Sequence, residues 1–178
     1  MKIVPLPFET AALTGFTHKA IITYADLTAA AGTQTLTIFP DGSVYGYNQQ
    51  TGVAMQDTTL TQLPAGFTVE KTQIRLVTPF TGGAISAATV TLGDKASTNR
   101  YMASAATDLF TAAGTNTKDN VASATTYTFS TTDVANSNAQ LVAVIATTGG
   151  NVNTATAGVL EIFLALADIS AQSTVTGT

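Results

Sequence analysis

The chain has 178 residues, the length of one typical domain, and it contains no Cys that could form a disulfide or a thiolate metal site. Charged residues make up only 10% of the sequence, the formal net charge is −4, and the seven Lys and Arg residues are scattered singly. Because no basic cluster is present to neutralise phosphates, the sequence argues against nucleic-acid binding.

The low charge predicts a largely neutral surface of Thr, Ser, Asn, Gln and Ala side chains. Soluble domains typically carry about 25% charged residues, which help to keep them apart in solution. We therefore expect neighbouring subunits to cover part of this surface. No run of about 18 apolar residues is present, and the start of the chain lacks the unbroken apolar region of a signal peptide. We expect no membrane contact, and assembly in a cytoplasm.

The first 17 residues are predicted to form an extended arm. Pro5 and Pro7 fix φ and remove backbone donors that a helix needs. The apolar residues of the arm are Ile3, Val4, Leu6 and Phe8. Such an arm lies either on its own domain or on a neighbour, and our hypothesis is that it contacts another chain.

Most of the remaining sequence alternates β-branched, aromatic and Thr residues with a period of two, which is the pattern of strands. Turn residues such as Pro40-Asp41-Gly42 separate the strand-like runs. The predicted strands cover residues 19–26, 33–39, 43–48, 67–80, 85–92, 125–133, 139–149 and 159–169, with a weak strand at 53–55. The last strand is apolar on both faces, which predicts a central position in a sheet.

Eight or nine strands with little helix predict an all-β fold, namely an antiparallel β-sandwich with a jelly roll as its topology. An immunoglobulin-like sandwich is the alternative, although the Cys and Trp residues typical of antibody domains are missing. We expect residues 18–170 to form a single domain and residues 171–178 to form a polar tail.

The stretch TPFTGGAISAATVTLGD, residues 78–94, contains the glycine pair Gly82 and Gly83. A phosphate-binding loop would need a helix directly after the glycines, so that helix N–H groups face the anion. The residues after Gly83 instead alternate with period two, and no Gly-Lys-Ser/Thr follows. We predict a structural turn between two strands, with at least one glycine at positive φ.

No group of residues predicts catalysis. His18 is the only histidine, no Gly-x-Ser-x-Gly is present, and we expect His18 at the surface. Most carboxylates lie in predicted turns, where Asp usually binds its own backbone. A surface calcium ion at Asp41 or Asp94 stays an alternative. We expect no enzymatic activity and no cofactor.

Tyr45 and Tyr47 fall on the same face of one predicted strand. Aromatic rings stack on sugar C–H faces, so this pair could form a glycan platform. The other interpretation is packing across strands or against a subunit.

Three segments of the sequence look familiar together, namely ITYADLTAAAGTQTLTIF (22–39), LPAGFTVEKTQIRLVTPFTGGAISAATVTLGD (63–94) and TAGVLEIFLALADI (156–169). They resemble segments of small structural proteins of tailed bacteriophages. Their shared features are turn and strand motifs, so the resemblance transfers no catalytic residue.

The resemblance implies a β-sandwich on the exterior of a virion head, acting as a capsid decoration or cement protein. The partners that it implies are the major capsid protein and further copies of the chain, with a homotrimer favoured. The alternative is a carbohydrate- or receptor-binding module of a phage fibre or tail.

Overall fold

The computed structural model describes residues 2–5, 15–38, 44–47, 54–57, 62–63, 65–103, 108–111, 117–120 and 127–168. The strands are β1 (Lys2–Pro5), β2 (His18–Thr23), β3 (Thr33–Thr37), β4 (Val44–Tyr47), β5 (Ala54–Asp57), β6 (Phe67–Thr81), β7 (Ala87–Asp94), β8 (Thr117–Asn120), β9 (Leu141–Thr148) and β10 (Ala157–Asp168). The helical elements are the short α-helix α2 (Thr131–Ala135) and the 3₁₀ turns η1 (Tyr24–Asp26) and η3 (Val152–Thr154).

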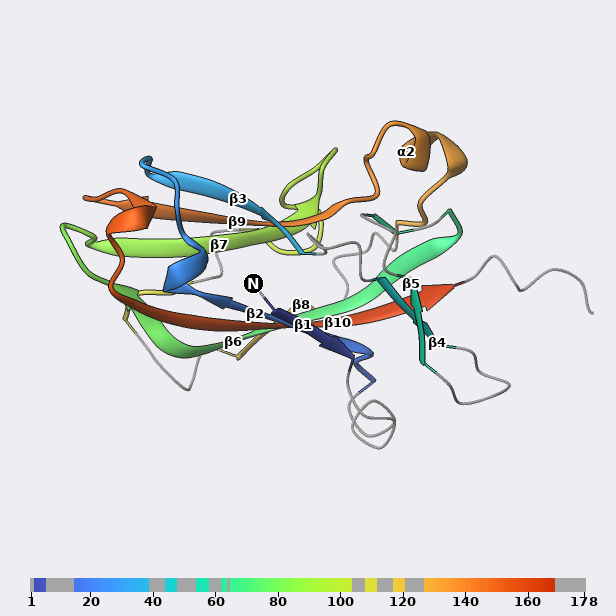
Figure 1. Ribbon diagram of the computed structural model, residues 1–178, viewed down its shortest axis with the longest axis horizontal. Helices are drawn as coiled ribbons and strands as arrows, with labels where there is room; N and C mark the ends of the chain where they lie inside the picture. The colour runs from blue at the N-terminus through green and yellow to red at the C-terminus, as the bar shows by residue number, and fades with distance from the viewer. Residues whose placement is uncertain are drawn as a thin grey trace, which may run out of the picture.

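The strands form two facing layers, which confirms the predicted all-β sandwich (Figure 1). One layer is a five-stranded sheet with the order β1-β2-β10-β6-β8, and the other is a three-stranded sheet with the order β3-β9-β7. Strands β4 and β5 form a separate pair. Every pairing between these strands is antiparallel.

The core lies between the two layers and follows from the alternation of side chains along each strand. In strands β2, β6, β7, β9 and β10, every second residue points inward, and most of these residues are almost completely buried. The inward residues form one hydrophobic cluster, which includes Ala20, Ile22, Ile74, Leu76, Val90, Leu92, Ala143, Ile145, Leu160 and Ile162.

Strand β10 is central, as its two apolar faces predicted, and it pairs with both β2 and β6. The pairing with β6 changes register between Ala165 and Leu166. At the same point of β6 the exposed residue Glu70 interrupts the alternation between Val69 and Lys71. This irregularity allows the 15-residue strand β6 to bend along the core.

Two predicted strands are partly wrong. The strand expected over residues 19–26 ends at Thr23, because Tyr24–Asp26 form the 3₁₀ turn η1. The expected strand over residues 125–133 gives way to helix α2, which begins at Thr131. Ser130 caps this helix, because its hydroxyl accepts from the Asp133 N–H while the Asp133 side chain accepts from the Ser130 N–H. The Ser-x-x-Asp spacing is a helix-start signal that outweighs the Thr-rich strand pattern before it.

We expect Ile162→Ala to lower the free energy of unfolding by about 2–5 kcal/mol, because Ile162 lies in the central strand with 0% of its surface exposed. Urea unfolding measures the change. Ile21→Ala is the matched control, since Ile21 is only half-buried on the neighbouring strand β2. An equal effect of the two substitutions would contradict the assignment of the core face.

Candidate interaction surfaces

The described residues contain no group of three or more His, Asp or Glu side chains that could hold a metal ion. Within the same ranges, no helix is long and apolar enough to cross a membrane. The candidates for a functional surface are therefore the positions that the sequence singled out and the outer faces of the two sheets.

The surface position expected for His18 is wrong. His18 is only 5% exposed and points to the same side of β2 as the core residues Ala20 and Ile22. The Thr17 hydroxyl oxygen lies 2.8 Å from its Nδ1. His18 is buried because β2 begins at this residue, and the alternation of the strand turns it inward opposite Leu164.

The arm residues Ile3 and Val4 belong to β1, whose backbone pairs with residues 18–21 of β2 at the edge of the five-stranded sheet. Pro5 ends this strand, as expected for a residue without an N–H donor. Leu6 and Phe8 lie outside the described residues. Contact of the arm with another chain stays a prediction.

Tyr45 and Tyr47 lie on β4, which pairs with β5. Their backbone positions are two residues apart in one strand, so they share a face. Their side chains lie outside the described part of the chain, and the glycan platform stays a prediction.

Gly82 and Gly83 connect β6 with β7, and thereby the five-stranded sheet with the three-stranded sheet. Their φ angles are 130° and 55°. A Cβ on Gly82 would lie 2.5 Å from the Thr156 nitrogen, and the Thr156 N–H itself donates to the Thr81 carbonyl at 2.9 Å. The chain enters strand β7 after the turn, so the helix that a phosphate loop requires is absent from this fully described stretch.

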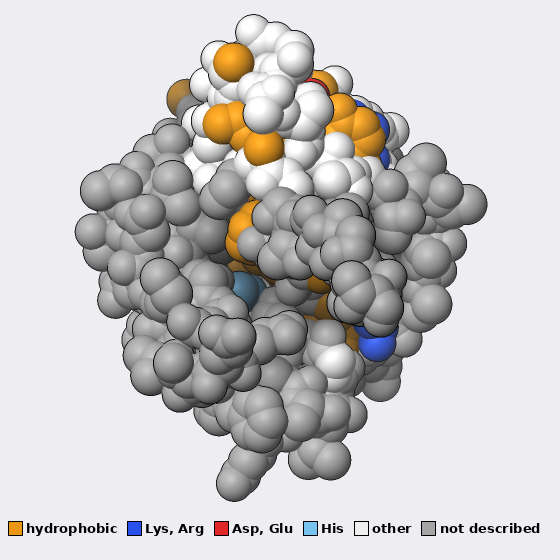
Figure 2. Space-filling view, turned by 90° about the vertical axis from the view of Figure 1, so that its right-hand side faces the viewer, with side chains coloured by type: hydrophobic (Ala, Val, Ile, Leu, Met, Phe, Trp, Pro, Cys, Tyr) orange, Lys and Arg blue, Asp and Glu red, His pale blue; other side chains and the backbone are white. Residues whose placement is uncertain are grey.

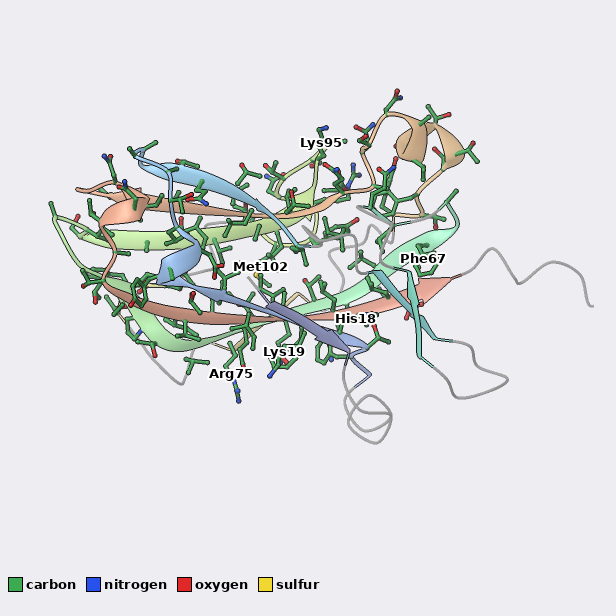
Figure 3. All side chains as sticks on the ribbon, in the orientation of Figure 1. His18, Lys19, Phe67, Arg75, Lys95 and Met102 are labelled. Carbon is green, nitrogen blue, oxygen red and sulfur yellow. The ribbon has the colours of Figure 1, made fainter. Side chains whose placement is uncertain are left out.

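The outer face of the five-stranded sheet carries a buried carboxylate between two cations. Glu161 on β10 is 8% exposed and accepts from Lys19 Nζ at 3.1 Å and from Arg75 Nε at 2.7 Å. Lys19 and Arg75 point away from the opposite sheet (Figure 3). Beside them, the Lys71 ammonium lies 4.4 Å from the Phe16 ring centroid. This outer face is therefore charged, and its carboxylate Glu161 is paired with both Lys19 and Arg75.

A second ionic network lies at the end of β7, where Asp94 binds the loop that follows the strand. The Asp94 carboxylate is 0% exposed and accepts from Arg100 Nε at 2.5 Å and from the N–H groups of Ala96 and Ser97 at 3.0 and 2.9 Å. Burial and the neighbouring Asp94 raise the pKa of Tyr101 well above its usual range. Because cationic and N–H donors surround Asp94, this carboxylate is not available to calcium. Asp41, the other calcium candidate, lies outside the described residues.

The same network reaches helix α2. The Arg100 guanidinium lies 3.9 Å from the centroid of the Tyr127 ring, a cation–π contact. The Tyr127 hydroxyl donates to Asp133 Oδ2 at 2.9 Å, and this hydrogen bond raises the pKa of Tyr127. The loop after β7 and the start of α2 are thus held together through one aromatic ring. Nothing in the separate sequence motifs indicated this connection.

The outer face of the three-stranded sheet differs from both ionic regions. Its outward residues are Thr33 and Thr35 on β3, Val144, Ala146 and Thr148 on β9, and Ala87, Thr89 and Thr91 on β7. Not one of these outward residues is charged. Figure 2 views the molecule from the end near α2. Most of the described surface there is also uncharged, with scattered hydrophobic side chains.

No protein-family description matches the sequence. No curated relative matches it either. Among solved structures, the chain is similar to one described as a cyanophage Pam1 capsid asymmetric unit, with a TM-score of 0.35 and 17% sequence identity. That alignment covers 82% of this chain and 81% of the other. A likeness this weak does not establish a shared fold or function.

We expect Gly82→Ala to destabilise the protein by more than about 1–2 kcal/mol, because it combines a positive φ with a collision against backbone. Gly15→Ala is the matched control, since Gly15 also has a positive φ but has no atom within 4 Å of the position that a Cβ would take. Thermal and urea unfolding measure both variants. Millimolar ATP should leave both melting curves unchanged, and a stabilisation by ATP that Gly82→Ala removes would contradict the structural turn.

We expect Asp94→Ala to cost about 2–4 kcal/mol, because it leaves Arg100 and two N–H groups without their buried acceptor. The control is Glu70→Ala, because Glu70 is exposed and the loss of its side chain should cost less than about 1 kcal/mol. Urea unfolding measures both variants. Equal losses in the free energy of unfolding would contradict a stabilising role of the Asp94 network.

Proposed function

We propose that this chain is a non-enzymatic structural protein of a virion, and that it decorates or cements the exterior of a phage head. The observation that carries the proposal is the uncharged outer face of the three-stranded sheet, formed by Thr, Val and Ala side chains. An isolated soluble domain gains little from such a face, whereas a subunit packed among many neighbours can bury it. The resemblance of the sequence to small phage structural proteins supports the same role.

We propose a jelly roll as the topology of the sandwich. The order β2-β10-β6-β8 in one layer faces β3-β9-β7 in the other. Met102 and Asp108 form isolated bridges to Leu92 and Thr89 on β7, in the position of a fourth strand. Four strands against four in this order is the arrangement of a double-sheet jelly roll. In this scheme β1 is an additional edge strand, residues 18–170 form one domain, and residues 171–178 form a tail.

The proposed mechanism is burial of area across many copies. The subunit binds the major capsid protein as a homo-oligomer, with a trimer favoured because shells offer three-fold positions repeatedly. A stable contact of standard size buries about 1,600 Å² in total. Several contacts per oligomer add avidity, so that no single contact needs high affinity. Neither nucleic acid nor a membrane takes part.

We expect deletion of residues 2–12 to weaken binding to phage particles while the isolated protein stays folded. The deletion removes β1, which lies at the edge of the described five-stranded sheet beside β2, and it removes none of the described residues of the buried cluster. Binding to undecorated particles is measured by cosedimentation, and folding is measured by urea unfolding. Deletion of residues 171–178 is the control and should leave binding unchanged.

Unchanged particle binding by the 2–12 deletion would contradict the role of the arm. A cryo-EM map of the intact particle tests the function itself, because it shows whether the chain occupies the head exterior. Density on a fibre or tail, together with binding to a glycan array that depends on Tyr45 and Tyr47, would instead support the alternative function.

A further inference from the structure

The outer face of the five-stranded sheet gathers positive charge in a protein whose net charge is −4. Lys19 on β2 and Lys71 and Arg75 on β6 point away from the core residues with which they alternate. Lys95 stands on the opposite side of the molecule, after the end of β7 (Figure 3). An anionic partner is therefore attracted to this face more than to the molecule as a whole.

Two described carboxylates accompany the cations of this face. Glu161 is 8% exposed and is shared between Lys19 and Arg75, so one negative charge serves two positive charges. Glu70 is exposed at the irregularity of β6, next to Lys71. The described side chains around Arg75 therefore keep an excess of positive charge.

Arg75 is the most exposed of these cations, with 53% of its side-chain surface accessible to solvent. Its Nε lies 2.7 Å from Glu161 Oε2, and a second nitrogen of the same guanidinium lies 2.5 Å from that oxygen. A guanidinium has five N–H donors in a planar fork, so this contact with Glu161 uses only one edge of the group. The other edge has the geometry to bind a carboxylate of a partner.

An exposed apolar side chain stands beside Arg75. Val77 follows two residues later on β6, and 43% of its surface is exposed. The pairing of β6 with β10 shifts register between Val159 and Leu160, which leaves Val77 without a partner residue on β10. Such bulges direct a side chain out of the regular sheet surface. A partner that binds Arg75 can therefore also bury Val77.

The opposite end of this face is covered by the chain itself. Phe16 is only 4% exposed, and its ring lies 5.8 Å from the ring of Phe163 on β10. The Lys71 ammonium lies over the Phe16 ring at 4.4 Å from the centroid. The open part of the face is therefore the region around Arg75 and Val77.

The chemistry of this region selects among anionic partners. Nucleic acids and anionic membranes are bound by clusters of several cations. Here one of the two cations beside Arg75 and Glu161 is only partly exposed, and Glu161 itself repels phosphate groups. A protein surface that presents a carboxylate next to an apolar side chain matches Arg75 and Val77 with a single contact of each kind.

A second copy of the chain matches this region poorly, because its described Asp side chains already bind groups of their own chain. Each of them accepts hydrogen bonds from nearby N–H, hydroxyl or guanidinium groups. These carboxylates are Asp26, Asp94, Asp108 and Asp133. The partner that fits is therefore a different protein with an acidic surface.

We propose that the outer face around Arg75 and Val77, which we call the arginine patch, docks an acidic polypeptide surface of another protein. A partner carboxylate binds the exposed edge of the Arg75 guanidinium, and an apolar partner side chain packs on Val77. That the partner belongs to a phage shell rests on the proposed function, whereas the acidic character of the partner follows from the patch alone.

A labelled peptide of about twenty Glu residues tests the patch, with binding measured by fluorescence anisotropy at low ionic strength. We expect Arg75→Gln to weaken binding about tenfold. Lys95→Gln is the matched control, since it removes the same charge at an exposed position on the other side of the molecule, and it should leave binding unchanged. Raising the ionic strength from about 0.01 to about 0.15 M should also weaken binding, because the Debye length falls from about 30 to about 8 Å.

A second pair of variants keeps every cation and both ion pairs of Glu161. Val77→Glu places a carboxylate in the patch and should abolish binding of the Glu peptide. Thr35→Glu adds the same charge at an exposed position of β3 and should leave binding unchanged. Urea unfolding checks that each variant is folded. Equal binding by Val77→Glu and Thr35→Glu, or by Arg75→Gln and Lys95→Gln, would overturn the proposal.

Other occupants give different results. Tighter binding of a labelled DNA duplex, or of phosphatidylserine vesicles, than of the Glu peptide would overturn the proposal in favour of a phosphate ligand. Dimerisation in sedimentation velocity at low ionic strength that Arg75→Gln removes would overturn it in favour of a second copy.

The docking surface and the proposed function fail separately. If the protein cosediments with phage particles but the Glu peptide does not bind, or binds without dependence on Arg75, the arginine patch is wrong while the decoration role stands. If the Glu peptide binds as expected but no particle binding is found, the arginine patch stands and the decoration role is wrong.

Discussion

The structure depends on the pairing of β10 with β2 on one side and β6 on the other. This pairing joins the beginning, the middle and the end of the described chain in one sheet, and it presents Ile162, Leu160 and Ile74 to the core. The three-stranded sheet has an inner face to pack against only because this continuous apolar layer exists. Antiparallel pairing over such long sequence separations carries a large loop-closure cost, which the burial of the two inner faces offsets.

The few charged residues are used mainly to connect elements. Glu161 joins β10 to β2 and β6 through Lys19 and Arg75, and Asp94 holds the loop after β7 through Arg100. Partners of this kind are needed because an unpaired carboxylate in such buried positions would be costly. The described outward residues of β3, β9 and β7 carry no charge, in contrast to the outer face of the five-stranded sheet.

The two sheet faces suggest different roles in the proposed virion protein. The outer face of the five-stranded sheet carries cations that are partly engaged by Glu161, whereas the described outward residues of β3, β9 and β7 are Thr, Val and Ala. The edge strand β1 adds a third element, since an edge backbone can pair further.

The sequence by itself determined the all-β class, the positions of most strands and the central place of β10, because each depends on local alternation and apolar runs that are visible residue by residue. It also indicated a turn at Gly82 and Gly83, since glycine is the residue that positive φ favours. Helix α2 was missed at a point where the Ser130 cap competes with a strand-like Thr pattern.

Only the tertiary structure decided which face each alternating residue occupies, and this is where the predictions about single residues failed. His18 was expected at the surface, but the register opposite Leu164 turns it inward. Likewise, Thr35 and Thr91 lie far apart in the sequence, and only their shared pairing with Val144 on β9 places them in one row. Local patterns fix the period of a strand, but the faces of a sandwich arise from pairings between distant strands, because a shift of one residue in register exchanges the inner and outer faces.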